Sequence, residues 1–572
     1  MSVVIDLTVP NSLSWSNMTA LSENGAVQLS STGESRVDLF FNAVRSTSPE
    51  RVNSLVKDVL CDIFSHSHTA AEKSFIAADL FCQLFHLRAT RGMGKGERDL
   101  FIHAFVQLHQ KFPSTTESLV QEIPHFGSWK DLLEIMVHGA TTDSLKSECT
   151  RVFANQLKQD AKILDESESE CCSLSLAGKW APREGKAYDR KGKVVDALCL
   201  HLFDSPSAYS RRKEYRRLLS RLNAHLDVPE RSMSTGKWAH LDFKKVPAVC
   251  LERHRKAFLN EHLHNCDRHA NDTTGNRHPN DKDRIACRQN LVKILTEGCI
   301  NGSQLFPHQI VQKITPYAVR SSVDDILCNA QWKAIRESVL ASMAEALKQS
   351  DLKQHIHLGN LVPLVDVSGS MSGEPMEVAI ALGILVSEVT ADSFKNRVLT
   401  FDSQPQWFVF DKNDTLVDKV CKLRRAPWGC STNFALALKK IYEVVKRNKL
   451  SEDQIPNLIV FSDMQFNAAD HAYLTNYEDI VYSFAFLGKS ICGKPYSPPK
   501  IIFWNLRGNS SSGVHAPCSA LSENVQCLSG FSGSLLKLVI SCDELVENTS
   551  SQCVHKKKVT PTPARPAPRE RC

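Results

Sequence analysis

An aspartate and two serines stand at alternate positions at the end of a short apolar segment. They are Asp366, Ser368 and Ser370, and the apolar segment is LVPLVDV, residues 361–367. Its length and residue types are typical of a buried parallel strand. Alternate residues of an extended chain point the same way, so the three side chains can face one ion. Because a carboxylate and two hydroxyls are hard oxygen ligands, the pattern predicts a site for Mg²⁺ or Mn²⁺.

Two later segments offer further oxygen ligands. The loop GCSTNF, residues 429–434, brings Thr432 to a position just before a predicted helix. The apolar segment NLIVFSD, residues 457–463, reads as another buried strand and ends in Asp463. Open α/β sheets bind ligands beyond the carboxyl ends of their parallel strands, so these loops are expected to meet at one point. The predicted metal site is Asp366, Ser368, Ser370, Thr432 and Asp463. The alternative is that both aspartates only cap turns and hold no ion.

Strand-like and helix-like segments alternate around these residues, which predicts a doubly wound, mostly parallel α/β domain over about 355–545. We expect helices at 375–394, 433–447 and 532–540. We expect strands at 361–367, 397–401, 406–410, 457–463, 479–487 and 499–506.

The three-part pattern resembles the metal-ion-dependent adhesion site (MIDAS) of von Willebrand factor A domains, which have a Rossmann-like fold. The resemblance implies that Asp366, Ser368 and Ser370 bind the ion. It also implies that Thr432 binds the ion directly in one state and that Asp463 binds it directly or through water. The family usually leaves one coordination position open, which a partner's carboxylate can fill. The resemblance therefore implies a non-enzymatic protein that binds a protein partner through its ion.

Enzymatic readings use the same residues differently. Phosphatases of the haloacid-dehalogenase type also place an aspartate nucleophile after a first strand, but they need a second carboxylate two residues later as general acid and base. This chain has Ser368 there, which argues against that chemistry. Two alternatives stay open: a metal-dependent phosphotransferase or hydrolase built on Asp366 and Asp463, and a protein–protein scaffold whose ion is purely structural.

The N-terminal part has the apolar spacing of helices. Apolar residues recur at intervals of three and four, which predicts an irregular, solenoid-like helical-repeat region over 36–350, after an irregular lead-in at 1–35. The clearest helical segments are 37–45, 52–64, 72–90, 98–112, 131–139 and 324–349.

Two basic segments of the helical region could contact RNA phosphates. The first is the loop GMGKGER, residues 92–98, with its flanks. The second is RRKEYRRLLSRLNAHL, residues 211–226, within a basic stretch at about 179–256. The alternatives are a tight interhelical turn and a solvated helix face. The candidate RNA-binding residues are Arg88, Arg91, Lys95, Arg98, Arg211, Arg212, Lys213, Arg216, Arg217 and Arg221.

Longer segments, among them LRATRGMGKGERDLF (87–101), IPHFGSWKDLL (123–133) and IFWNLRG (502–508), resemble an uncharacterised family. Its members pair a helical N-terminal half with a von Willebrand A-like C-terminal half. That layout is similar to the Ro ribonucleoprotein autoantigen (TROVE-like), whose helical ring binds small and misfolded RNAs. The resemblance implies a small structured RNA as a further partner.

Bulk composition limits the setting. The 572 residues carry a net charge of +6 and a pI near 8.4, below the value of about 9 typical of dedicated nucleic-acid-binding domains. The odd number of cysteines, 19, favours reduced thiols in the cytoplasm or nucleus. We expect no membrane-spanning segment, since no apolar run approaches the required length. The Pro-rich, basic segment 546–572 is predicted to be disordered. The sequence does not indicate an oligomeric state.

Overall fold

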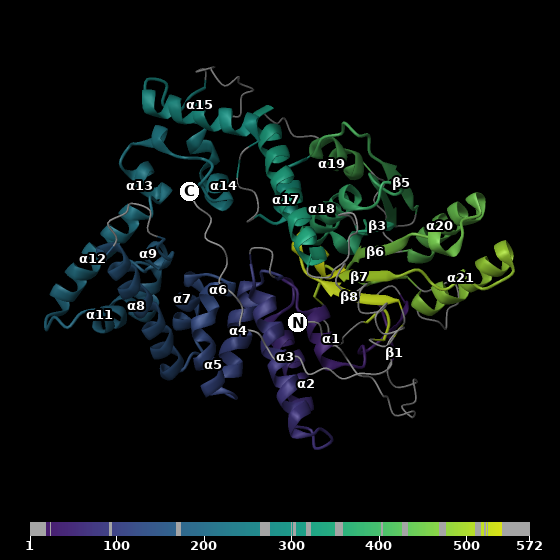
Figure 1. Ribbon diagram of the computed structural model, residues 1–572, viewed down its shortest axis with the longest axis horizontal. Coiled ribbons are helices and arrows are strands. Elements are labelled where there is room, and N and C mark those ends of the chain that lie inside the picture. The colour runs from purple at the N-terminus through teal and green to yellow at the C-terminus, as the bar shows by residue number, and fades with distance from the viewer. Residues whose placement is uncertain are drawn as a thin grey trace.

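Helices make up the first part of the chain, and the last part contains a six-stranded sheet with flanking helices (Figure 1). The computed structural model describes residues 19–22, 25–90, 94–166, 173–262, 275–298, 300, 305–315, 322–348, 358–401, 404–425, 433–467, 476–508, 516–519, 522 and 524–539. The predicted tail at 546–572 lies outside these ranges.

The N-terminal part is helical, as the apolar spacing predicts. Its helices are α1 (Ser35–Asn42), α2 (Pro49–Phe64), α3 (Ala70–Arg88), α4 (Arg98–His109), α5 (Pro113–Leu119), α6 (Ile123–Phe126), α7 (Trp129–Val137), α8 (Asp143–Glu166), α9 (Ala177–Trp180), α10 (Ala187–Gly192), α11 (Val194–Leu202), α12 (Ala208–His225), α13 (Pro229–Ser234), α14 (Ala248–Phe258), α15 (Lys282–Glu297), α16 (Pro307–Val311) and α17 (Ser322–Lys348).

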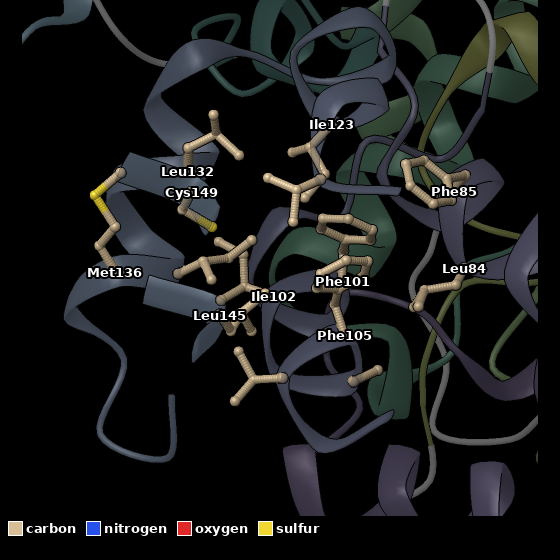
Figure 2. Packing of buried hydrophobic residues seen from close by; sticks show 14 of the residues in the cluster. Leu84, Phe85, Phe101, Ile102, Phe105, Ile123, Leu132, Met136, Leu145 and Cys149 are labelled. Carbon is tan, nitrogen blue, oxygen red and sulfur yellow. The ribbon is translucent and has the colours of Figure 1, made fainter. Parts of the chain in front are cut away.

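Local capping and apolar packing explain why these helices form. A reciprocal capping box opens α3: Thr69 N donates to Glu72 Oε2 at 2.7 Å, and Glu72 N donates to Thr69 Oγ1 at 3.3 Å. Inside the array, the ring of Phe85 meets those of Phe101 and Phe105 edge-on, at 5.6 and 6.3 Å between centroids (Figure 2). These rings join α3 to α4 in one continuous core.

A short antiparallel hairpin precedes the helices, within the segment predicted to be irregular. Its strands are β1 (Thr19–Leu21) and β2 (Val27–Leu29). Backbone bridges join Gly25 to Asn467 and Leu29 to Ala516. The hairpin therefore packs against the C-terminal α/β part, more than 400 residues away in sequence.

The C-terminal part contains a mixed sheet with the strand order β5-β4-β3-β6-β7-β8. Every neighbouring pair is parallel except β4 and β5, so one edge strand is antiparallel. This is the 3-2-1-4-5-6 order of doubly wound sheets, whose chain reversal lies between the two central strands. The strands are β3 (Leu361–Asp366), β4 (Arg397–Phe401), β5 (Gln406–Val409), β6 (Asn457–Ser462), β7 (Ile501–Asn505) and β8 (Val525–Ser529).

Helices cover both faces of this sheet. Successive residues of β3 point to opposite faces, so Val365 joins the core beneath α18 and Leu364 joins the core beneath α20. The helices of this part are α18 (Glu374–Val389), α19 (Leu416–Arg424), α20 (Phe434–Asn448) and α21 (Asn476–Cys492). The helical N-terminal region and the C-terminal mixed sheet with flanking helices agree with the predicted fold class at this coarse level.

One predicted strand is wrong: residues 479–487 lie in helix α21. Its apolar residues Ile480, Phe484 and Leu487 are buried at spacings of four and three, whereas Tyr482 and Phe486 face outward. The apolar run is therefore amphipathic with a helical period, which its short length and aromatic content concealed. The strand at the far edge is instead β8, a half-polar segment without strand-like alternation.

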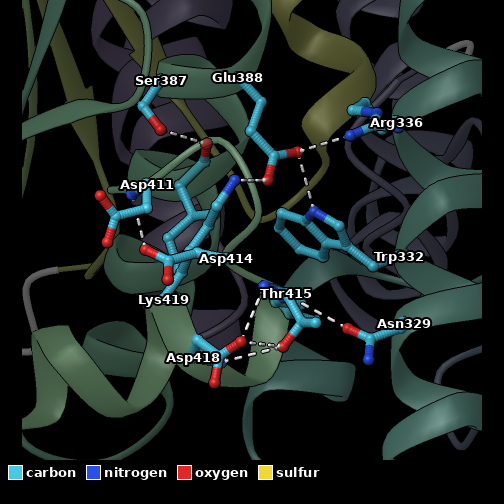
Figure 3. Close-up of polar contacts among 12 residues, drawn as sticks. Asn329, Trp332, Arg336, Ser387, Glu388, Asp411, Asp414, Thr415, Asp418 and Lys419 are labelled. Atoms are coloured by element: carbon cyan, nitrogen blue, oxygen red, sulfur yellow. Dashed lines mark hydrogen bonds and ion pairs between the residues drawn. The ribbon is translucent and has the colours of Figure 1, made fainter. Parts of the chain in front are cut away.

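Helix α17, the last of the predicted helical region, packs on the α/β part. Its Trp332 lies in the same apolar core as α18. Trp332 Nε1 donates to the buried Glu388 Oε2 at 3.0 Å, and Lys419 Nζ donates to Glu388 Oε1 at 2.7 Å (Figure 3). The helical region before residue 350 and the α/β part after it thus share a packed interface. No helix in the described ranges has the length and apolarity needed to cross a bilayer.

Candidate metal centre

The two central strands bring Asp366 and Asp463 to one edge of the sheet. Asp366 is the last residue of β3, and Asp463 directly follows β6. These strands are parallel neighbours, with Val365 opposite Phe461. Both aspartates are buried, at 0% and 1% exposure. The convergence of two predicted ligands at the carboxyl edge follows from this register.

Asp366 is held in place by two hydrogen bonds. Ser368 N donates to Oδ1 at 3.0 Å, and Ser462 Oγ donates to Oδ2 at 2.5 Å. Burial and the neighbouring Asp463 carboxylate nevertheless raise the pKa of Asp366 to about 7. A second negative charge is therefore unfavourable at this position as long as no cation lies between the carboxylates.

The serines predicted as ligands lie next to each other in the loop after β3. Ser368 Oγ and Ser370 Oγ are 3.1 Å apart, and Ser370 belongs to a single 3-10 turn, Gly369–Met371. Gly373 then takes a positive φ of 95° and α18 begins at Glu374. A residue with a side chain would be strained there, so glycine allows the loop to turn directly into the helix.

A strained turn presents Asp463. Met464 has a φ of 64°, in the left-handed region that non-glycine residues seldom adopt. The N-terminal hairpin secures this turn: Gln28 Nε2 donates to Met464 O at 2.5 Å, and Ser22 Oγ donates to Phe466 O at 2.6 Å. This support could not be predicted from the sequence, because the hydrogen-bonded residues lie 436 and 444 positions apart.

Arg507 is a component of the site that sequence reasoning missed. It follows β7, the next strand of the sheet, and its Nη1 donates to Ser370 O at 2.6 Å. The same nitrogen lies 3.9 Å from Asp463 Oδ2, and the side chain is half exposed. Arg507 therefore anchors the serine loop and offsets part of the negative charge. The only sequence feature that could have drawn attention to Arg507 was its place in the segment 502–508, which resembles the uncharacterised family.

The chemistry of the donor set fits a hard divalent cation. Two buried carboxylates and two hydroxyls meet at one sheet edge, and an ion would relieve the repulsion between the carboxylates. No group of three or more His, Cys, Asp and Glu side chains suited to a metal occurs among the described residues. Thr432, the fifth predicted ligand, lies outside the described residues.

Comparison with known proteins places the chain in a family. It is 30% identical over 555 residues to "Uncharacterized protein L728" of Acanthamoeba polyphaga mimivirus, an alignment that covers 94% of this chain and 86% of the viral protein. Residues 22–149 and 143–276 match the Domain of unknown function DUF2828, and residues 360–568 match the Domain of unknown function DUF7788. The chain belongs to this DUF2828–DUF7788 family. No solved structure matches it.

Two of the cations predicted around the loop at 92–98 form ion pairs within the DUF2828 region. Arg88 is 2% exposed, and its Nη2 lies 2.6 Å from Asp131 Oδ2. Arg98 Nε donates to Asp131 Oδ1 at 2.9 Å. Arg88 is thus unavailable to RNA phosphates in this structure, and Arg98 is already paired. Arg91 lies outside the described residues.

Lys95 joins the DUF2828 region to the sheet of the DUF7788 region. It is 1% exposed, and its Nζ donates to Phe40 O, to Ala43 O at 3.1 Å and to Ser529 Oγ at 2.7 Å. Ser529 ends β8. Because Lys95 is buried, it links the two parts of the chain and is not exposed to RNA phosphates.

Most of the predicted cations of α12 have a partner in the protein. Arg212 makes a two-pronged contact with Asp196 at 2.7 Å, while Arg211 Nη1 donates to Ser205 O at 2.5 Å. Lys213 and Arg217 are exposed. The remaining two predicted residues form ion pairs, Arg216 with Glu184 and Arg221 with Asp165. Neighbouring carboxylates thus neutralise a large part of the basic helix.

Proposed function

We propose that this protein holds one Mg²⁺ or Mn²⁺ in a von Willebrand A-like DUF7788 domain and uses the ion to bind a carboxylate of a protein partner. The carrying observation is the buried pair Asp366 and Asp463 at the ends of adjacent parallel strands, beside the hydroxyls of Ser368 and Ser370. The 3-2-1-4-5-6 strand order with an antiparallel edge supports the Rossmann-like part of the proposal.

The described residues have separate roles in this proposal. Asp366 and Asp463 supply charge, and Ser368 and Ser370 supply neutral oxygens. Thr432 completes the set by resemblance. Ser462 orients the Asp366 carboxylate through a hydrogen bond. Each carboxylate oxygen can accept more than one hydrogen bond, so lone pairs on both oxygens remain available for the ion. When bound, the ion supplies a positive centre for an acidic side chain.

The phosphotransferase alternative is less well supported. A nucleophilic carboxylate has to reach the phosphorus of its substrate, yet Asp366 is fully buried and both of its oxygens accept hydrogen bonds. The residue two positions later is a serine, which is a poor general acid or base. Binding therefore suits this geometry better than turnover.

Manganese binding to the full-length protein tests the proposal in two steps. Electron paramagnetic resonance counts the Mn²⁺ bound by the wild type, by Asp463→Asn and by Asp411→Asn, a matched control at an exposed carboxylate. We expect one ion per chain in the wild type and the control, and none in Asp463→Asn. Equal binding by all three proteins would refute the metal site.

Water-proton relaxation of the Mn²⁺-loaded protein then reports on the open coordination position. A peptide with one glutamate should lower the relaxation enhancement as its carboxylate displaces a bound water. The same peptide with glutamine should not. If neither peptide changes the relaxation enhancement, the ion is purely structural and partner binding through it is refuted.

A further inference from the structure

A cavity of about 590 Å³ opens in the DUF2828 region, far along the chain from the metal centre. Its walls come from α6, α7, α8 and α9, together with the loop that precedes α9. The volume lies in the usual range of small-ligand sites, about 300–1,000 Å³. The described lining combines aromatic rings with side-chain amides, and this combination limits the ligand class.

Three rings contribute to the cavity. Trp180 is 36% exposed, and His125 is exposed as well. Trp129 is half-buried and is braced from behind by the ring of Phe153, at 5.4 Å between centroids. Solvent-facing rings on a rigid helical frame offer flat surfaces on which a planar group can stack.

One face of α8 supplies the polar groups. Arg151, Asn155 and Gln159 are spaced by four residues, so their side chains follow one another along the helix surface. All three are exposed. Gln121 adds a further amide from the segment before α6. A side-chain amide both donates and accepts hydrogen bonds, which matches the mixed edges of nucleobases.

The charge of the cavity suits a phosphate-bearing ligand. Among the described lining residues, none carries a carboxylate, and Arg151 carries a positive charge that it shares with Glu148 at 2.5 Å. Helix α12 packs against both α8 and α9 and carries the exposed cations Lys213 and Arg217. A phosphodiester strand that extends from the cavity over α12 would therefore have Lys213 and Arg217 available for contact.

Hydrogen bonds and ion pairs hold the frame of the cavity in place. Ser128, whose neighbour Trp129 begins α7, donates from its backbone N to Asp131 at 2.9 Å, and Arg88 and Arg98 hold this carboxylate from the other side. Asp160 accepts hydrogen bonds from Ser175 N at 3.2 Å and Ser175 Oγ at 2.5 Å, which fixes the loop before α9. Preorganisation of this kind lowers the entropic cost of binding.

The same helices share the apolar core beneath the cavity. Ile123 of α6, Leu132 of α7 and Cys149 of α8 belong to one buried cluster (Figure 2). The cavity therefore lies on a packed platform, and substitution of its exposed side chains should leave the fold intact.

We propose that this cavity takes one unstacked nucleobase of a single-stranded RNA. The base stacks on Trp180 and its edge meets the amides of Asn155 and Gln159, while the phosphates run toward α12. Unstacked bases held by aromatic rings and side-chain amides are the usual basis of single-strand recognition. A free nucleotide offers the same chemistry, so the test includes both sources.

The test uses the full-length protein and fluorescein-labelled ten-nucleotide RNAs of each single base, measured by anisotropy at fixed salt. Uridine and adenosine monophosphates are titrated in parallel. The variants are Trp180→Ala, the double variant Asn155→Ala/Gln159→Ala, and Tyr482→Ala as a matched control on an exposed ring of the DUF7788 region. Thermal melts establish that each variant is folded.

We expect the wild type and Tyr482→Ala to bind at least one oligonucleotide equally. Trp180→Ala should bind on the order of ten-fold more weakly, in keeping with the loss of one stacked base. The double variant should lose the preference between bases. Absence of oligonucleotide binding, an equal effect of all variants, or binding of free nucleotides alone would overturn the proposal.

Discussion

Ser462 Oγ donates a hydrogen bond of 2.5 Å to Asp366 Oδ2, and this contact links the ends of the two central strands. Both residues have no exposed surface. The same hydroxyl accepts a hydrogen bond from Met464 N at 3.1 Å, so it also braces the turn that carries Asp463. One serine thereby sets the positions of both carboxylates, and the metal centre depends on it.

Ser462→Ala should destabilise the protein and weaken its hold on the cation. The substitution leaves the buried Asp366 carboxylate without one donor, a loss of about 1–3 kcal/mol in the free energy of unfolding. Urea unfolding in the absence of metal measures the loss. Ser372→Ala, at an exposed hydroxyl that donates to Gly369 O, serves as the control. A stability equal to that of the control would contradict the assigned role.

Arg507→Gln should tighten cation binding. Glutamine keeps a polar side chain but removes the positive charge that lies 3.9 Å from Asp463 Oδ2, and it is shorter than the arginine that contacts Ser370 O. Because the guanidinium is half exposed, we expect the affinity for Mn²⁺ to rise by only about two- to five-fold. Isothermal titration calorimetry at low and high salt should show a smaller gain at high salt. Weaker binding at both salt concentrations would show that Arg507 assists the ion.

Gln28→Leu tests the support that the N-terminal hairpin gives to the metal centre. The change removes the donor to Met464 O, the carbonyl of the strained left-handed residue. We expect a loss of about 1–3 kcal/mol in unfolding free energy and a lower affinity for Mn²⁺. Should stability fall while the affinity stays at the wild-type value, the hairpin would be a general support with no influence on Asp463.

His86 should make the fold sensitive to acid. Burial, with help from Lys95, lowers its pKa to about 4, whereas an unfolded histidine has a pKa near 6.5. Between these values the unfolded chain binds the extra proton. The free energy of unfolding therefore falls as pH drops from 6.5 to 4, by at most about 1.4 kcal/mol per pH unit.

The acid sensitivity is measured by urea unfolding from pH 7 to 4.5. His86→Gln should flatten the dependence of stability on pH, and His240→Gln, at an exposed ring, should leave it unchanged. Identical pH profiles for the two variants would show that His86 is not the group responsible.

Structural features that depend only on neighbouring residues could be predicted from the sequence. The strands that lead to Asp366 and Asp463 contain short apolar runs at 361–365 and 458–461, and parallel pairing of two such runs places their ends together. These features require only neighbouring residues, so the candidate ligands could be named before the structure. The spacing of Ser368 and Ser370 predicted alternate residues of an extended segment, whereas the structure places Ser370 in a 3-10 turn that brings the two hydroxyls to 3.1 Å.

Features that depend on distant contacts could not be predicted. Residue type alone marked Lys95 as a surface cation, whereas three acceptors from α1, its flank and β8 draw it into the interior. Met464 gives no local warning of a positive φ, since Gln28 and Ser22 stabilise the turn from the other end of the chain. Burial and long-range hydrogen bonds, not composition, decide these cases.

The measurement that most directly tests the central claim is the free energy of unfolding with and without Mg²⁺, in the wild type and in Asp366→Asn. At an Mg²⁺ concentration about 100 times the dissociation constant, the wild type should gain about 2.7 kcal/mol. Asp366→Asn should gain nothing. Without metal it should be at least as stable as the wild type, because one of two buried like charges is gone. The account would be contradicted if neither Mg²⁺ nor Mn²⁺ changed the free energy of unfolding of the wild type, or if the asparagine variant gained as much stability as the wild type.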